Sequence, residues 1–416
     1  MHQAAANELP LNELRVAVDI GSTRHRVAIG GGNGKLIDEF DITHDGPGIA
    51  DFFARIARHE KRQAATAVHV AMEGYGGYAR PLDARVLTRG WHLYNVNNLK
   101  LARFKEIFPA PAKTDAIDAR RMLELFSLRE RVPMARAVLQ EIAPVGESEE
   151  RLKALTRRRK QLVEDRMRVS MRMQADLQAA CPGLLAITGQ ADNLWFLSLL
   201  SLRDDLVKLQ GLRQTTLLAV PGIGKRYAAK VRDWQAEAIF SPGADYLGPM
   251  IIADARHMLE LRAQILALEA QIEQLSQASA MAQRIRTIPG FGLISAAELA
   301  GEIGSIDRFA KADSLAMYLG SAPLDHSSGK RNASKVPRQI NFRARDALMI
   351  ATVHHVAAVP ASKAYFEKKR AAGKTHQQAV RATARILAKV LFSMLKHDKD
   401  YQPRFASDPL PHADAA

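Results

Sequence analysis

Four acidic residues in the first third of the chain have the types and spacing of a metal-binding site. Asp19 and Glu73 each end a strand-like run, while Asp115 and Asp118 lie three positions apart in KTDAIDARR. Carboxylates at the ends of neighbouring strands meet at one edge of a sheet, and a pair spaced i, i+3 shares one helix face. Such oxygen ligands suit Mg²⁺ or Mn²⁺, and two of these ions can stabilise both oxygens of a phosphodiester displacement.

Each of these acids taken alone also has a purely structural explanation. Asp115 can cap a helix, Asp118 can be a solvated acid of its first turn, and the other two can simply end strands. Asp19, however, lies in VDIGST within a strand otherwise suited to burial, and Glu73 is followed by a glycine. VDIGST also fits the phosphate loop of actin- and sugar-kinase-type ATPases. We find no second phosphate loop or adenosine-binding glycine turn in the sequence, so a nuclease-like site is favoured.

The composition favours a polyanionic partner. The 416 residues carry 59 Lys and Arg against 44 Asp and Glu, a net charge of +15. Nucleic acid is the leading candidate and an anionic membrane surface the second. The single cysteine, Cys181, fits a reducing compartment, and neither a signal peptide nor an apolar run of ~18 residues is present. We therefore expect a cytoplasmic protein without a membrane-inserted segment.

The hydrophobic patterns predict an α/β domain followed by helices. Three antiparallel strands are expected within 14–43, and helices then alternate with strands up to about residue 98, which indicates a mixed sheet. From Glu149 onward the strand signal ends. Apolar residues from Met258 to Leu275 alternate steps of three and four, as in a coiled coil or an antiparallel helix pair. The expected divisions are a polar leader (1–13), the α/β domain (14–148), a helical coiled-coil region (149–283), a helical C-terminal domain (284–398) and a disordered tail (399–416).

The run from Glu73 to Ala119 resembles a known family, the DEDD transposases of insertion sequences. The run matches that family in the order of its motifs, which are an acidic residue, Gly-x-Tyr, Val-Asn, Lys and KTDAIDA. The resemblance continues in three later segments: IPGFG, YLGSAPLDHSSGK and ARILAKVLFSMLKHDKDYQP. The family includes Piv-type DNA invertases and bridge-RNA-guided recombinases. The resemblance, which spans Val16 to Pro403, implies an RNase H-like (RuvC-like) first domain with Asp19, Glu73, Asp115 and Asp118 as its catalytic metal ligands.

The resemblance also implies a C-terminal transposase domain whose serine attacks DNA. The matching residue in HSSGK is Ser328, with Ser327 as a rival. Two segments near this serine, GSAP and KVPRQINFRAR, depart from the family pattern. The implied partners are donor and target DNA and a structured guide RNA, and the expected coiled-coil helices indicate a dimer or tetramer of the chain.

Three groups of residues are candidates for contacting nucleic acid. The basic helix expected from Arg151 to Leu177 can follow a phosphate backbone or present a solvated face, and the Pro-Gly-x-Gly turn at 289–292 can offer N–H groups to phosphate or simply connect helices. Cations near the candidate serine can hold the scissile strand. The candidates are Arg157, Arg158 and Lys160 in the helix, Gly290 and Gly292 in the turn, and Lys330, Arg331, Lys335 and Arg338 in the serine loop.

These observations predict a transposase or recombinase that cleaves and exchanges DNA strands at specific sites for an insertion element. An invertase of the same family would use the same residues. A Holliday-junction resolvase would need only the carboxylates. A sugar-kinase-like ATPase would bind nucleotide at Asp19 to Thr23, and a nucleic-acid-binding protein without catalysis would need none of these groups.

Overall fold

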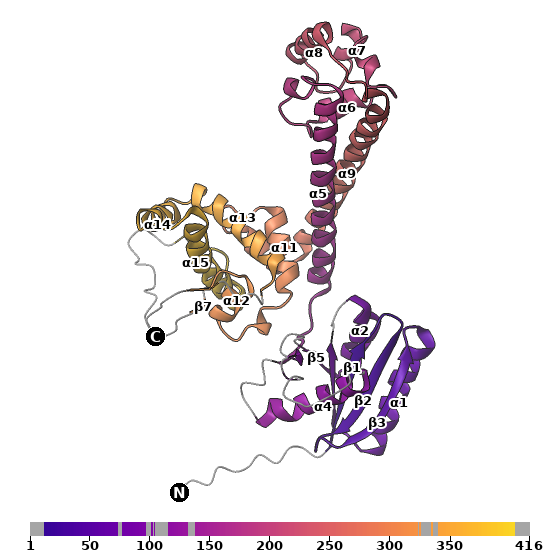
Figure 1. The fold of residues 1–416 in the computed structure, drawn as a ribbon. Coiled ribbons are helices and arrows are strands. Elements are labelled where there is room, and N and C mark those ends of the chain that lie inside the picture. The colour runs from indigo at the N-terminus through magenta and orange to yellow at the C-terminus, as the bar shows by residue number, and fades with distance from the viewer. Residues whose placement is uncertain are drawn as a thin grey trace. The chain divides into compact units, whose positions relative to one another are not determined.

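The computed structural model describes residues 12–73, 77–96, 101–102, 104, 115–131, 138–322, 324–325, 334–335 and 340–403. The chain divides into two compact units, with the division between Pro144 and Val145 (Figure 1). The boundary expected after residue 148 stays a prediction. We call residues 1–144 the first unit and residues 145–416 the second unit.

The first unit is built on a mixed six-stranded sheet with the order β3-β2-β1-β4-β5-β6. Its strands are β1 (Glu13–Ile20), β2 (Arg24–Gly31), β3 (Leu36–Thr43), β4 (Ala67–Glu73), β5 (His92–Val96) and β6 (Leu139–Glu141). The first three strands are antiparallel, β4 and β5 run parallel to β1, and β6 runs antiparallel to β5. The mixed sheet predicted from the sequence is therefore confirmed.

Helices cover both faces of this sheet. They are α1 (Gly46–Arg62), α2 (Arg80–Thr88), which follows the 3-10 turn η1 (Gly77–Ala79), and α4 (Asp115–Arg131). Successive residues of a strand point to opposite faces, so each face of β1 contributes to a different core. Val18 belongs to an apolar cluster with Phe52 of α1 and Leu82 of α2, whereas Ala17 belongs to another with Met122 of α4.

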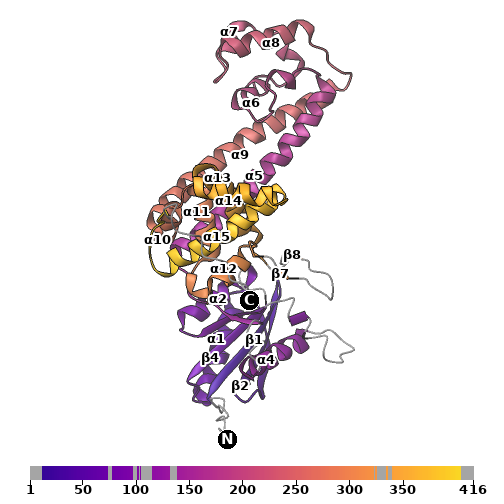
Figure 2. The same cartoon turned by 90° about the vertical axis from the view of Figure 1, so that its left-hand side faces the viewer.

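The second unit is helical and contains two long helices that lie side by side (Figures 1 and 2). Its larger helices are α5 (Glu147–Ala180), α6 (Leu194–Leu200), α7 (Gln214–Leu218), α8 (Lys225–Glu237), α9 (Ala244–Ala278), α10 (Ala280–Arg286), α11 (Leu293–Ile303), α12 (Ala312–Tyr318), α13 (Phe342–Ala358), α14 (Pro360–Ala371) and α15 (His376–Lys396). Its short 3-10 turns are η3 (Leu185–Ile187), η4 (Val207–Leu209) and η5 (Ile306–Arg308).

The two long helices, α5 and α9, run antiparallel. Arg159 pairs with Glu269, and Arg172 pairs with Asp254, so the sequence numbers rise along one helix as they fall along the other. The seam residues Met258, Ile265 and Ile272, predicted from their spacing, are buried. The apolar periodicity thus becomes the contact between two distant helices of one chain.

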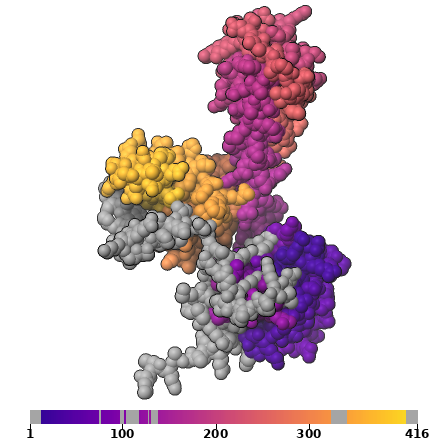
Figure 3. All heavy atoms as spheres, viewed as in Figure 1, coloured from indigo at the N-terminus to yellow at the C-terminus, as the bar shows by residue number. Residues whose placement is uncertain are grey.

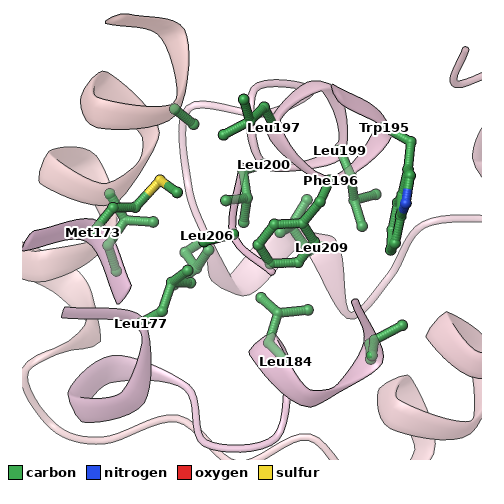
Figure 4. Packing of buried hydrophobic residues seen from close by; sticks show 14 of the residues in the cluster. Met173, Leu177, Leu184, Trp195, Phe196, Leu197, Leu199, Leu200, Leu206 and Leu209 are labelled. Atoms are coloured by element: carbon green, nitrogen blue, oxygen red, sulfur yellow. The ribbon is translucent and has the colours of Figure 1, made fainter. Parts of the chain in front are cut away.

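Each end of this helix pair carries its own apolar core. At one end, Met173 and Leu177 of α5 pack with Phe196 and Leu200 of α6 and with Leu206 (Figure 4). At the other end, a second cluster joins α10, α11, α12, α13 and α15 and includes side chains from both long helices. The space-filling view shows the helix pair running between these two masses (Figure 3). Because residues on both sides of 283 share the second cluster, the division into a helical region and a C-terminal domain stays a prediction.

None of the helices in the described ranges is long and apolar enough to span a bilayer.

Candidate active site

Two of the predicted carboxylates lie side by side on neighbouring strands of the first unit. Asp19 of β1 and Glu73, the last residue of β4, are direct partners in the parallel register. Side chains alternate along a strand, so Asp19 lies on the same face of the sheet as Ala17, and Glu73 on the same face as Ala71. Both alanines pack in the cluster beneath α4. Both carboxylates therefore belong to the α4 face of the sheet, near the carboxyl ends of their strands.

Helix α4 supplies the third carboxylate. Asp118 is buried, with 5% of its surface exposed, and the adjacent Ala119 packs in the cluster that contains Ala17. Two contacts give the direction of the helix. Arg120 binds Glu39, which lies level with Ala17 across β2, and the Leu123 side chain lies over Gly30, which pairs with Arg15 nearer the start of β1. Helix α4 therefore runs opposite to β1, and its first turn begins towards the end of the sheet where Asp19 and Glu73 lie.

Asp115 is the first residue of α4, one turn before Ala119, but its side chain lies outside the described residues. Among the side chains that the structure describes, no three His, Cys, Asp or Glu groups lie close enough together to hold a metal ion. The four-carboxylate site therefore stays a prediction. The backbone register, the shared face and the direction of α4 are the structural facts that support it.

Cations beside these carboxylates were not predicted from the sequence. Arg26 of β2 is the register partner of Asp19 on the side of β1 away from β4. It lies on the same face of the sheet as Ala28, which packs in the cluster beneath α4. Its guanidinium donates to Asp41 and to Glu39, each at 3.2 Å. The hydrogen bond from Arg120 lowers the pKa of Glu39 below its usual value. The sequence did contain a signal for Arg26, because it is a charged residue inside the strand-like run RHRVAI. The alternation of side chains along that strand places Arg26 on the same face as Asp19.

The segment that carries the candidate serine is described only in part. The candidates Ser327, Ser328, Lys330, Arg331 and Arg338 lie outside the described residues, as does the side chain of Lys335. The backbone of two short strands, β7 (Leu324–Asp325) and β8 (Ser334–Lys335), forms an antiparallel pair. The roles of these residues stay predictions.

The basic helix α5 uses two of its candidate DNA-binding residues in contacts within the chain. Arg157 donates to both carboxylate oxygens of Glu302, at 2.6 and 2.8 Å, and Lys160 donates to Asp346 at 2.9 Å. Arg158, between them, is exposed. Arg157 and Lys160 therefore join α5 to α11 and α13, while Arg158 has the exposure that a phosphate contact needs. Nucleic-acid binding by these three residues stays a prediction.

The turn with Gly290 and Gly292 is tightly packed on one side. Gly290 has a positive φ of 86°, and a Cβ built on it would lie 2.7 Å from the carbonyl carbon of His354 and 2.8 Å from Cα of His355 in α13. Gly222, in the similar turn VPGIG at 220–224, has the same φ of 86° but only Trp195 Cβ nearby, at 3.2 Å. Gly292, which precedes α11, is exposed. Close helix packing thus explains Gly290, and a phosphate contact at Gly290 and Gly292 stays a prediction.

The chain matches two transposase family models. Residues 16–182 match the transposase model of the DEDD group of IS110, and residues 282–367 match the transposase family of IS116, IS110 and IS902. It is 26% identical to the uncharacterized 43.6 kDa protein of insertion element IS110 from Streptomyces coelicolor, over 94% of this chain and 95% of that protein. It is 28% identical to the uncharacterized 42 kDa protein of insertion element IS900 from Mycobacterium paratuberculosis, over 80% of this chain and 84% of that protein.

The two matched segments fall on the two parts of the fold that the sequence singled out for chemistry. The first contains the strands that carry Asp19 and Glu73 together with helix α4, and the second contains the serine segment and helix α11. Since the relatives extend over nearly the whole length as well, this protein belongs to the IS110 family of DEDD transposases.

Proposed function

We propose that this transposase cuts and rejoins DNA with a carboxylate-bound divalent metal in the first unit and a serine nucleophile in the second. The observation that carries the proposal is the placement of Asp19 beside Glu73 on the α4 face, with Asp118 buried on the helix that begins towards the same end of the sheet. The serine rests on the family resemblance of HSSGK.

The donor set fits Mg²⁺ or Mn²⁺. Asp19, Glu73, Asp115 and Asp118 would hold the metal, because carboxylate oxygens are the ligands that these hard cations prefer. When bound, the metal would stabilise negative charge on the oxygens of the scissile phosphodiester. Arg26 and Arg120, each paired with Glu39, border this edge and keep one acid of the neighbouring strand β3 neutralised.

The serine would carry one DNA end between cleavage and rejoining. Its Oγ forms a bond to phosphorus while the phosphorus–oxygen bond to the neighbouring nucleotide breaks. The serine loses its proton, and the leaving oxygen gains one from solvent. A hydroxyl of the recipient strand then attacks the same phosphorus and loses its proton, and the serine oxygen leaves and takes up a proton. Ser328 is the proposed nucleophile, with Ser327 as its rival.

The proposed partners are donor and target DNA, a structured RNA encoded with the element, and further copies of the chain. The net charge of +15 and the exposed Arg158 support a polyanionic partner. Met167 and Met171 of α5 and Leu266 of α9 are more than half exposed, at 53%, 67% and 56%, which supports a dimer or tetramer formed through the long helices. RNA guidance rests on the resemblance alone.

The metal site is tested with purified protein, RNA transcribed from the flanks of the reading frame, and labelled duplexes of the element ends. Asp118→Asn should lower strand cleavage by about 100-fold or more and weaken Mn²⁺ binding measured by calorimetry. Glu124→Gln is the matched control, because Glu124 is an exposed acid on the same helix. Cleavage by the Asp118 variant at the wild-type rate would remove the metal site.

The serine is tested in the same reaction by denaturing electrophoresis, which retains protein covalently linked to labelled DNA. Ser328→Ala should abolish the adduct if Ser328 is the nucleophile, and Ser327→Ala should abolish it if the rival is used instead. Ser334→Ala, in the same segment, should leave the adduct unchanged. Cleavage without any adduct, dependent on the carboxylates alone, would instead indicate resolvase-type hydrolysis.

A further inference from the structure

A buried carboxylate lies where four helices of the second unit meet. Glu302 of α11 is fully buried, and its two oxygens accept from the Arg157 guanidinium of α5 at 2.6 and 2.8 Å. Burial alone would raise the pKa of Glu302, but the hydrogen bonds from Arg157 and Asn341 hold it below its usual value. Glu302 is therefore an ionised group in the protein interior, and its charge is balanced by a cation from a helix 145 positions away in sequence.

Asn341 completes the hydrogen bonding of this carboxylate. Its Oδ1 accepts from the backbone N–H groups of Arg343 and Ala344, which makes it the N-cap of α13. The amide nitrogen is thereby left to donate, and it does so to Glu302 Oε2 and to the Tyr318 hydroxyl, both at 2.7 Å. The Tyr318 hydroxyl in turn donates to the Glu302 carbonyl oxygen at 2.6 Å. We call Arg157, Glu302, Tyr318 and Asn341 the Glu302 junction.

The junction joins the two ends of the segment that carries the candidate serines. Tyr318 is the last residue of α12 and Asn341 immediately precedes α13, so residues 319–340 run between them. The Asn341 N–H also donates to the Tyr318 carbonyl at 2.9 Å. A Cβ on Gly320 would lie 2.8 Å from the Ile340 side chain, so the ends are closely packed as well. Lys160 and Asp346 add a second link between α5 and α13.

We propose that the Glu302 junction positions the serine segment for attack on DNA. The proposal rests on the serine chemistry proposed above, and it makes Arg157, Glu302, Tyr318 and Asn341 positioning residues. Apolar side chains could hold two chain ends together with equal or greater stability, because a buried ion pair gains little over a packed hydrophobic group. A satisfied polar network instead fixes one orientation. That property matters for a nucleophile, since a misplacement of about 1 Å can slow a reaction about 100-fold.

Asn341→Ser separates positioning from helix capping. The shorter hydroxyl side chain can still cap α13, but it cannot reach Glu302 and Tyr318 as well. Tyr318→Phe removes only a hydroxyl and keeps the ring contact with Phe309. We expect each variant to form the covalent adduct about 10- to 100-fold more slowly while its dissociation constant for the duplex stays within about twofold.

Thr375→Ala is the matched control for stability. Thr375 caps α15 through a hydrogen bond from the Gln378 N–H at 3.3 Å, and among the described residues its side chain bonds to this helix and not to the four junction residues. Its loss should lower Tm by a few degrees and leave the rate of adduct formation unchanged. A Thr375 variant that is slowed as much as Asn341→Ser at an equal loss of Tm would overturn the positioning role.

A donor–acceptor exchange provides the rescue. Asn341→Asp places a second carboxylate against Glu302 and should slow adduct formation by at least about 10-fold, because like charges repel in a buried site. Adding Glu302→Gln supplies a donor opposite the new acceptor, and we expect it to recover most of that rate. The positioning role is rejected if Asn341→Ser and Tyr318→Phe form the adduct at the wild-type rate. It is also rejected if the double variant, Asn341→Asp with Glu302→Gln, forms the adduct no faster than Asn341→Asp alone.

The outcome also distinguishes this proposal from the proposed function. If neither Ser327→Ala nor Ser328→Ala alters the adduct, the serine chemistry fails and the positioning role fails with it. If the adduct depends on one of these serines but Asn341→Ser forms it at the normal rate, only the positioning role is wrong.

Discussion

Replacing Arg157 by alanine removes the cation that neutralises Glu302. The Glu302 side chain is fully buried and that of Arg157 is 42% exposed, so the change leaves a carboxylate in the interior without its charged donor. Loss of one member of a buried ion pair destabilises a protein by about 3–5 kcal/mol. Asn341 still donates to Glu302, and the Arg157 guanidinium is partly solvated, so we expect a loss of about 2–3 kcal/mol in the free energy of unfolding at pH 7.

The pH dependence gives a second measure of the same effect. A carboxyl group whose pKa is depressed on folding stabilises the protein above its unfolded pKa, and this contribution is lost as the pH falls through the folded pKa. The pKa of Glu302 is lowered in the protein, so its pairing stabilises fully at neutral pH. In the alanine variant, burial without the cation should raise that pKa. The difference between wild type and variant should therefore be largest near pH 7 and should shrink as the pH falls, first through the raised pKa of Glu302 in the variant and then through its lowered pKa in the wild type.

The assay is urea unfolding at pH 7 and pH 4, with Arg158→Ala as the control. Arg158 is the next residue of the same helix and is exposed, so its removal should change the unfolding free energy by less than about 0.5 kcal/mol. If Arg158 contacts phosphate, its loss should reduce the salt dependence of DNA binding by about one unit of slope. Equal unfolding midpoints for Arg157→Ala and wild type at pH 7 would refute the structural role of the Arg157–Glu302 pair.

Three further predictions concern other positions of the second unit. Burial raises the pKa of Glu298 to about 7, so the folded protein keeps a proton on this carboxyl between about pH 4.5 and pH 7. The free energy of unfolding should therefore fall as the pH rises through that window. Across the same window, the Tm of Glu298→Gln should fall less than the Tm of the wild type. Gly290→Ala should cost more stability in thermal unfolding than Gly222→Ala, because both have a φ of 86° but only Gly290 lies against the backbone of α13. Burial raises the pKa of Cys181 to about 11, so iodoacetamide at pH 8 should label the native protein far more slowly than the urea-unfolded chain, and rapid native labelling would contradict this.

The strand and helix patterns alone located much of the first unit. Alternating apolar residues predicted antiparallel strands followed by strands alternating with helices, and the structure has β1 to β5 in this arrangement. The same patterns placed Asp19 and Glu73 at strand ends, because local periodicity depends only on neighbouring residues. The structure adds that the two are direct register partners, which no single strand can specify.

The long helices also show which features local periodicity predicts and which it does not. The three- and four-residue steps from Met258 to Leu275 indicate one apolar face, and that face is buried against α5. A dense basic run predicts a polyanionic partner, and it gave no sign that Arg157 and Lys160 are held by Glu302 and Asp346. Glu302 and Asp346 lie more than 140 positions away in sequence from their basic partners, and the local pattern of their own helices does not indicate these ion pairs.

The sequence by itself therefore determined which residue types are available for chemistry and which local elements carry them. Asp19, Glu73 and Asp118 could be named as candidates this way because strand ends and helix faces follow from short-range periodicity. Only the tertiary structure decided which cations are already neutralised within the protein and why Gly290 must be a glycine. Burial and ion pairing depend on contacts between segments far apart in the chain, and the desolvation that makes such contacts decisive has no local signature in the sequence.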